Sequence, residues 1–289
     1  MYRGSPANAL DLTLSPLTFN DYNTLESQMH TAVHFITRWR SLHIEFPSYS
    51  PFLLSRALSQ CCGRTMHAPT LKELRLIYRQ NDDPEEYFLF SGGTAPRLRH
   101  LSVDGIRLAW QPSLFQNLTS LEYTHHGFTT GPQAVREVMN IVSISVKLTD
   151  LRILFPRPKR ITAPTRNSSN SRPRQSYLTT KRITLPYLQC LHLVSETRDI
   201  PYELTHIASL ISTPSLTALH FVDLRYREHQ FASLKAFMQL YQFPPALQVM
   251  SVAHGWYDGT ALKGILRRLP KMQRLAIRQD GSRDRFYHF

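Results

Sequence analysis

Residues 98–103 of the chain, Leu98-Arg-His-Leu101-Ser-Val103, contain the pattern that decides the fold. An apolar residue is followed by two variable residues, a leucine, one variable residue and a second apolar residue. The 289-residue sequence holds nine copies of this motif, the others beginning at Trp39, Leu71, Leu118, Leu148, Leu188, Leu216, Leu247 and Met272. One copy carries little information because leucine is common, whereas nine copies in one chain indicate an internal repeat.

The copies follow one another at near-regular intervals. Their central positions are on average about 29 residues apart, within the range of leucine-rich repeats. The longest interval runs from Leu151 to Leu191 and contains a basic segment. A proline stands two residues before six of the copies, at Pro69, Pro96, Pro186, Pro214, Pro245 and Pro270.

Each copy predicts a short β-strand. Its last two apolar positions are two residues apart, so they point to one face, and the residue between them points to the other. A strand this short cannot bury its apolar face alone, but parallel stacking of many strands builds a continuous core. Helical spacing is found between copies in residues 52–58, 134–144, 202–211, 231–240 and 261–269, with Asp258 or Thr260 able to cap the last helix.

Together these features predict an α/β fold: a leucine-rich-repeat solenoid, or horseshoe, with a parallel concave sheet and helices or irregular turns on the convex side. We expect residues 1–289 to form one irregular domain of about nine repeats. A doubly wound α/β domain also alternates strands and helices. It would have longer apolar strands, however, and the sequence contains no glycine-rich phosphate loop.

Several phrases of the sequence resemble the leucine-rich region of the F-box-like proteins of mushroom-forming fungi. They are residues 95–105 (APRLRHLSVDG), 117–122 (NLTSLE), 39–44 (WRSLHI) and the opening 9–14 (ALDLTL). The resemblance covers nearly the whole chain outside residues 156–182 and the C-terminal end. It implies the substrate-recognition module of an SCF-type ubiquitin ligase receptor, whose repeats present a surface to the target protein.

The sequence departs from that family in two places. No Leu-Pro-rich three-helix F-box segment precedes the first repeat, so we expect a Skp-type adaptor and a cullin as partners only if an F-box lies upstream. The ladder asparagine of regular repeats is also missing, which predicts uneven turns. The expected function is a non-catalytic protein–protein interaction scaffold for a protein target that the sequence does not name.

The net charge of +13 is concentrated in two segments. Residues 156–182 have eight basic residues and no acidic one, and residues 267–289 have seven basic and two acidic residues. We predict that 156–182 is a disordered basic insertion, because it has few apolar residues to offset its ordering entropy, and that 279–289 is a basic tail. The alternative function is binding of nucleic acid or an anionic surface through the C-terminal arginines and the basic loop, whose residues are Arg157, Lys159, Arg160, Arg166, Arg172, Arg174, Lys181 and Arg182.

The residues between the paired apolar positions are expected to line the concave sheet as a polar strip. The extended faces of solenoids suit protein recognition, and an ordinary solvated face is the alternative. The predicted strip consists of His43, Arg75, Ser102, Glu122, Arg152, His192, His220 and Ser251, with Ala276 at the last such position and Arg278 beside it. Arg75 and Arg152 are the strongest candidates, since arginine anchors interfaces more often than serine or lysine.

No motif indicates an enzyme, and we predict no cofactor and no metal. The sequence has no GxSxG, HExxH, P-loop or CxxC pattern, and Cys190 is interpreted as a strand residue. His192 and His220 occupy equivalent positions in consecutive repeats, which places them roughly 5 Å apart, but no third ligand shares their row at close spacing. The adjacent His125 and His126 are expected in a loop.

The composition also bears on the compartment. No apolar run reaches about 18 residues, so we expect no membrane contact. The first 14 residues lack the apolar core of a signal peptide, and three cysteines cannot form a disulfide framework. The expected location is cytoplasmic or nuclear.

Overall fold

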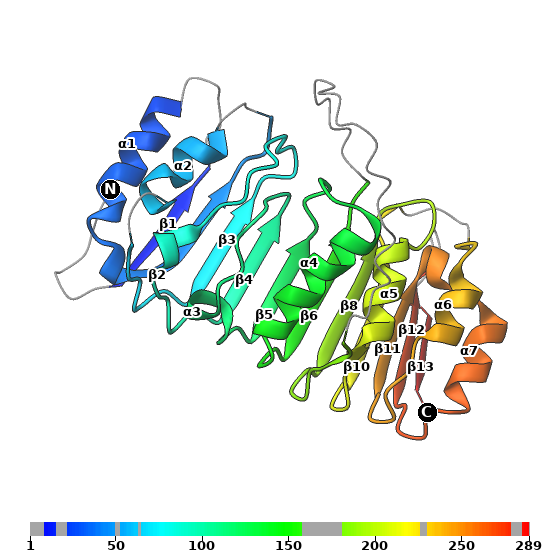
Figure 1. Cartoon of the computed structure of the whole chain (residues 1–289). Coiled ribbons are helices and arrows are strands. Elements are labelled where there is room, and N and C mark those ends of the chain that lie inside the picture. Colours follow the sequence, from blue (N-terminus) through cyan, green and yellow to red (C-terminus); the bar gives the residue numbers. More distant parts are fainter. Residues whose placement is uncertain are drawn as a thin grey trace.

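The computed structural model describes residues 9–15, 22–49, 53–62, 65–157, 181–225, 230–278 and 285–288. Its main feature is an 11-stranded sheet in which the order of the strands follows the chain (Figure 1). The first ten strands of this sheet are parallel, and the last pairs antiparallel with its neighbour. The predicted α/β class and parallel sheet are therefore confirmed.

The strands of the main sheet are short. They are β1 (Leu10–Leu14), β2 (Trp39–Glu45), β3 (Glu73–Ile77), β4 (His100–Asp104), β5 (Ser120–Thr124), β6 (Asp150–Phe155), β8 (Cys190–Ser195), β10 (Ala218–Asp223), β11 (Val249–Ala253), β12 (Arg274–Arg278) and β13 (Arg285–His288). A separate two-stranded sheet joins β7 (Ile183–Thr184) and β9 (Ile211–Ser212).

Helices lie between the strands along the chain. They are α1 (Tyr22–Val33), α2 (Leu53–Cys62), α3 (Pro112–Phe115), α4 (Gly131–Ile144), α5 (Tyr202–Leu210), α6 (Leu234–Leu240) and α7 (Gly259–Leu266), with 3₁₀ turns at Ile36–Arg38, Leu89–Gly92 and His254–Trp256. All five segments with helical spacing contain a helix. The helices α1 and α3 were not predicted, because no motif of the sequence marks them.

The nine sequence motifs occupy equivalent positions in nine neighbouring strands. Their central apolar residues pair in register from Leu42 in β2 through Leu121 in β5 to Leu275 in β12. Leu12 of β1 joins the same row opposite Leu42. The apolar positions of the motif are thereby stacked into one continuous row, as the alternation of side chains along a strand requires.

The core lies between this row and the helices. Leu42, Leu121 and Leu151 are each 1% exposed. The inward face of α4 adds Ala134, Val135, Val138, Met139, Ile141 and Val142, all buried. Asp258 caps α7 as predicted: its Oδ1 accepts hydrogen bonds from the backbone N–H groups of Thr260 and Ala261, at 2.8 and 2.9 Å.

The two basic segments are described only in part. Of the basic loop, Arg157, Lys181 and Arg182 are described, and Lys159, Arg160, Arg166, Arg172 and Arg174 lie outside the described residues. In the C-terminal segment the structure places strand β13, for which the sequence carried no motif. None of the helices in the described ranges is long and apolar enough to span a membrane.

Candidate functional site

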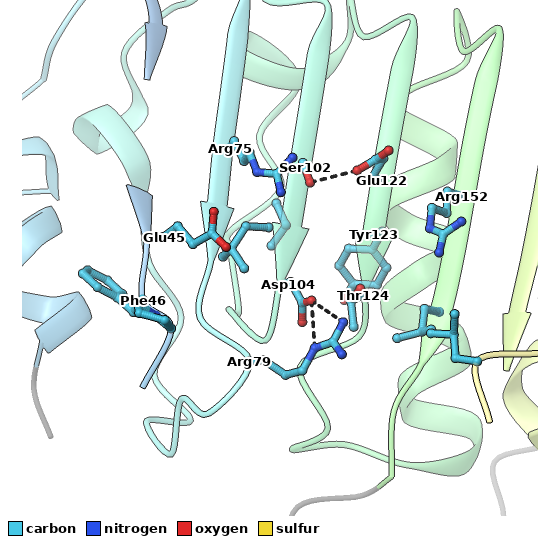
Figure 2. Close-up of a pocket in the computed structure, with 15 residues that line it drawn as sticks. Glu45, Phe46, Arg75, Arg79, Ser102, Asp104, Glu122, Tyr123, Thr124 and Arg152 are labelled. Carbon is cyan, nitrogen blue, oxygen red and sulfur yellow. Dashed lines mark hydrogen bonds and ion pairs between the residues drawn. The ribbon is translucent and has the colours of Figure 1, made fainter. Parts of the chain in front are cut away.

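The candidate site lies on the face of the sheet that points away from the helices, which we call the open face. In Figure 2 the polar side chains of Arg75, Ser102, Glu122 and Arg152 stand in front of the strands, with helices behind them. The residue between the two apolar positions of each motif points to this face, and these residues also pair in register: His43, Arg75, Ser102, Glu122, Arg152, His192, His220 and Ser251. The predicted strip therefore forms one continuous row across eight strands.

Arg278 does not lie in this row. It pairs with Ala253 at the end of β12, and the residue of β12 that pairs with Ser251 is Ala276, which is buried. The row is therefore polar from β2 to β11 and ends in an apolar side chain. Arg278 therefore lies beside the row, two residues further along the strand, as its place in the sequence predicts.

Several polar side chains of the open face interact between neighbouring strands. His43 Nε2 lies 2.9 Å from an oxygen of Glu73, and Ser102 donates a hydrogen bond of 3.2 Å to Glu122. Near the sheet's first edge, Asp11 accepts hydrogen bonds from both Arg40 and Ser41, and these bonds lower the pKa of its carboxyl group. Such exposed pairs add little stability.

An open hollow of about 390 Å³ lies over strands β2 to β6 (Figure 2). Its polar lining comes from Glu45, Arg75, Arg79, Ser102, Asp104, Glu122, Thr124 and Arg152, and the buried side chains of Tyr123 and Phe46 border it. Glu122, Arg75 and Arg152 belong to the predicted strip, whereas Arg79 was not predicted as part of the site. Arg79 follows β3 by two residues and reaches the hollow from the loop.

Arg79 is fixed by a buried carboxylate. Its Nε and Nη2 donate hydrogen bonds of 3.1 and 2.9 Å to Oδ2 of Asp104, and the pairing raises the pKa of the guanidinium. Asp104 is 8% exposed, and its other oxygen, Oδ1, has no hydrogen-bond partner among the described residues. This ion pair orients the Arg79 side chain along the wall of the hollow.

Arg75 and Arg152 behave differently from Arg79. Within the part of the chain that the structure describes, neither guanidinium takes part in a hydrogen bond or an ion pair. Arg75 is exposed and Arg152 is half-buried. They flank the Ser102–Glu122 pair from β3 and β6, three strand spacings or roughly 14 Å apart. The hollow therefore presents two arginine side chains that are available to an external group.

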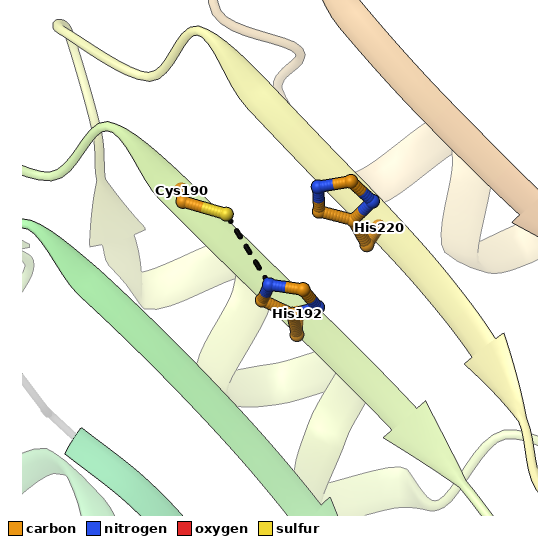
Figure 3. Close-up of side chains that lie close together, drawn as sticks. All are labelled: Cys190, His192 and His220. Atoms are coloured by element: carbon orange, nitrogen blue, oxygen red, sulfur yellow. Dashed lines mark hydrogen bonds between the residues drawn. The ribbon is translucent and has the colours of Figure 1, made fainter. Parts of the chain in front are cut away.

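A second cluster on the open face contains Cys190, His192 and His220 (Figure 3). The two imidazole rings stack with centroids 4.4 Å apart, close to the predicted separation. The expectation concerned only the row of the two histidines, and Cys190 lies in the adjacent row, two residues before His192 on the same strand. Its Sγ is 3.2 Å from His192 Nε2, so a third potential ligand lies beside the pair.

A third cluster lies on the helix side and contains His125, His126 and Glu137. Both histidines follow β5 and are 1% exposed, so the predicted loop pair is buried. Glu137 of α4 accepts hydrogen bonds from Thr129 Oγ1 at 2.7 Å and His126 Nε2 at 3.0 Å, and His125 Nε2 lies 3.5 Å away. Burial raises the pKa of Glu137, but the hydrogen bonds from these donors together lower it by more than burial raises it. The pKa of Glu137 is therefore well below its usual range.

The ring nitrogens of this third cluster are already occupied. His125 Nδ1 accepts from the backbone N–H of Gly127, and His126 Nδ1 accepts from that of Phe128. Each Nε2 must then carry the proton that faces Glu137. No imidazole lone pair of the cluster remains for a metal, so we assign it a structural role in holding the turn after β5 against α4.

Comparison with known proteins identifies no family for the chain. A scan against protein-family models finds no match, and a search of curated proteins finds no similar sequence.

Proposed function

We propose that the chain is a leucine-rich-repeat solenoid that acts as a non-catalytic scaffold for protein recognition. The repeat period and the chain-order succession of parallel strands support the solenoid. A doubly wound domain reverses its strand order at a switch point, and the described main sheet has no such reversal. The resemblance to fungal F-box-like proteins makes a substrate-recognition module of a ubiquitin ligase receptor the most specific form of this proposal.

The observation that carries the proposal is the pair of available arginines on the hollow. Arg75 and Arg152 make no hydrogen bond or ion pair with the described residues, although carboxylates stand on the same face. A guanidinium binds a carboxylate through two parallel hydrogen bonds, and buried arginines are frequent anchors of interfaces. The hollow therefore suits a partner surface that offers two acidic groups roughly 14 Å apart, across three strand spacings.

The carboxylates beside these arginines favour specificity. Glu45 and Glu122 also line the hollow, so a partner with an unbroken acidic surface would meet like charges beside each arginine. Like charges placed against each other across an interface cost several kcal/mol, roughly, and so exclude wrong partners. We therefore expect a partner with separated acidic groups and at least one basic or hydrogen-bond-donating group between them.

The test is affinity purification of the tagged full-length chain from its own cells, with quantification of the proteins that accompany it. The variant Arg75→Glu/Arg152→Glu is compared with Arg97→Glu/Lys271→Glu, which makes the same change of charge at two exposed positions outside the hollow. We expect the first pair to lose the partner at least tenfold and the control pair to retain it. Equal recovery with both pairs would refute the assignment of the hollow.

The same experiment separates the alternatives. A Skp-type adaptor and a cullin among the retained proteins would support the ligase form of the proposal. A chain that lacks residues 158–180 retains its partner if the open face binds it. Loss of all partners in that deletion, with binding that falls steeply as salt is raised, would instead favour nucleic acid or an anionic surface bound by the basic loop.

A further inference from the structure

The cluster of Cys190, His192 and His220 lies outside the hollow of the proposed function and carries chemistry of its own (Figure 3). Cys190 and His192 are two residues apart on β8, so both point to the open face. His220 on β10 is the register partner of His192. One potential ligand atom from each residue lies within 4.8 Å of the other two. We propose that these three side chains bind a divalent transition-metal ion of the zinc class.

The three groups match the ligand preference of such an ion. Zinc binds thiolate sulfur at about 2.3 Å and imidazole nitrogen at about 2.0–2.1 Å, so its tetrahedral ligand atoms stand roughly 3.4–3.6 Å apart. Cys190 Sγ and His192 Nε2 are already 3.2 Å apart. The imidazoles lie nearly parallel, at 16°. Binding therefore requires one ring to turn about its side-chain torsions until both lone pairs point to one site.

The surroundings leave room for a fourth ligand. Cys190 and His192 on β8 stand beside their register partners Ala218 and His220 on β10. Ala218, the register partner of Cys190, has only a methyl group and leaves space there. The site thus has three protein ligands and one open position, the arrangement that leaves a zinc ion accessible to water or to an external group.

The protonation states of the ligands favour the metal. Burial, the neighbouring His220 and Arg152 together lower the pKa of His192 to about 4, and burial and Arg278 lower the pKa of His220. Both shifts favour the neutral imidazole, which has a lone pair for a metal ion. Burial and Asp150 raise the pKa of the Cys190 thiol, so the ion must displace its proton on binding.

Two charged side chains on the adjacent strand β6 have opposite effects on a cation at this site. Arg152, the register partner of His192, repels a bound cation, whereas Asp150, the register partner of Cys190, attracts it.

The buried cluster of His125, His126 and Glu137 does not offer its imidazole lone pairs to a metal ion. The Nδ1 atoms of both histidines accept backbone hydrogen bonds, and their Nε2 atoms face Glu137. We therefore expect one ion per chain, at Cys190, rather than two.

The proposal is tested by titrating the reduced, metal-free full-length chain with Co²⁺ and then displacing it with Zn²⁺. Thiolate coordination gives a sulfur-to-cobalt charge-transfer band, which we expect to saturate at one equivalent. Cys190→Ser should remove the band, and His220→Ala should weaken Zn²⁺ binding by more than the roughly 10- to 100-fold that changes to the partners of metal ligands cause. Cys62→Ser and His100→Ala are the controls. The first alters another thiol, the second an exposed histidine of the open face, and both should bind as the native chain does.

A measurement on the unaltered chain does not depend on whether the variants fold. Zn²⁺ should slow alkylation of Cys190 at least tenfold and leave alkylation of Cys62 unchanged, as read by peptide mass spectrometry. The absence of a charge-transfer band, equal binding by Cys190→Ser, or alkylation of Cys190 that Zn²⁺ does not slow would overturn the proposal. None of these outcomes bears on the partner test of Arg75 and Arg152, so the two proposals stand or fall separately.

Discussion

Replacing Glu137 by glutamine tests how the turn after β5 is held against α4. The carboxylate accepts two close hydrogen bonds, from Thr129 at 2.7 Å and His126 at 3.0 Å. A hydrogen bond to a charged group contributes about 1.5–3 kcal/mol and one to a neutral group about 0.5–1.5 kcal/mol. Glu137→Gln keeps the shape but removes the charge, so each bond loses about 1 kcal/mol, and we expect about 2 kcal/mol of lost stability in total.

The assay is urea unfolding followed by far-ultraviolet circular dichroism at neutral pH. Glu86→Gln is the matched control, because Glu86 is exposed and forms no hydrogen bond or ion pair with other described residues. We expect this surface change to stay within about 0.5 kcal/mol. If Glu137→Gln unfolds at the same urea concentration as the control, the buried network does not hold the turn and the reasoning is refuted.

Three further predictions concern the rest of the fold. Burial lowers the pKa of His125, and Glu137 offsets this only in part, so below about pH 6.5 the unfolded chain binds a proton at His125 more readily than the folded chain does. The free energy of unfolding should therefore fall as the pH drops, and the urea midpoint should be lower at about pH 5.5 than at about pH 7.5. Equal midpoints at the two pH values would contradict this prediction. Gly105→Ala should lower the free energy of unfolding by at least about 1–3 kcal/mol, because Gly105 has φ +75° and an added Cβ would stand 2.2 Å from the carbonyl oxygen of Tyr78. A thermal melting temperature equal to that of the native chain would contradict this prediction. Asp258→Ala should cost about 1 kcal/mol by removing the cap of α7, and Asp258→Asn should restore most of it in the same urea assay; no difference between the two variants would argue against the cap.

The strands and their alignment follow from local sequence. The motif repeats within six residues, and alternation along a strand decides which side chains share a face. The row from His43 to Ser251 was therefore predictable without any knowledge of the loops. The register partners of Leu101, namely Leu74 and Leu121, are likewise the central residues of their own motifs.

The features that were not predicted from the sequence depend on side chains in other rows of the sheet or on the geometry of loops. Cys190 could have been found from the sequence, because a residue two positions before His192 must point to the same face. The burial of His125 and His126 could not, since it depends on where α4 places Glu137. The pairing of Arg79 with Asp104 depends on the turn after β3, and no motif specifies that turn.

The claim that the hollow binds a partner through Arg75 and Arg152 is tested most directly by arginine-selective chemical labelling of the chain with and without its purified partner. In the free chain we expect both guanidiniums to react, because neither is paired with another described residue. With the partner bound, both should become protected while the exposed Arg97 continues to react. Unchanged labelling of Arg75 and Arg152 in the complex would contradict the account.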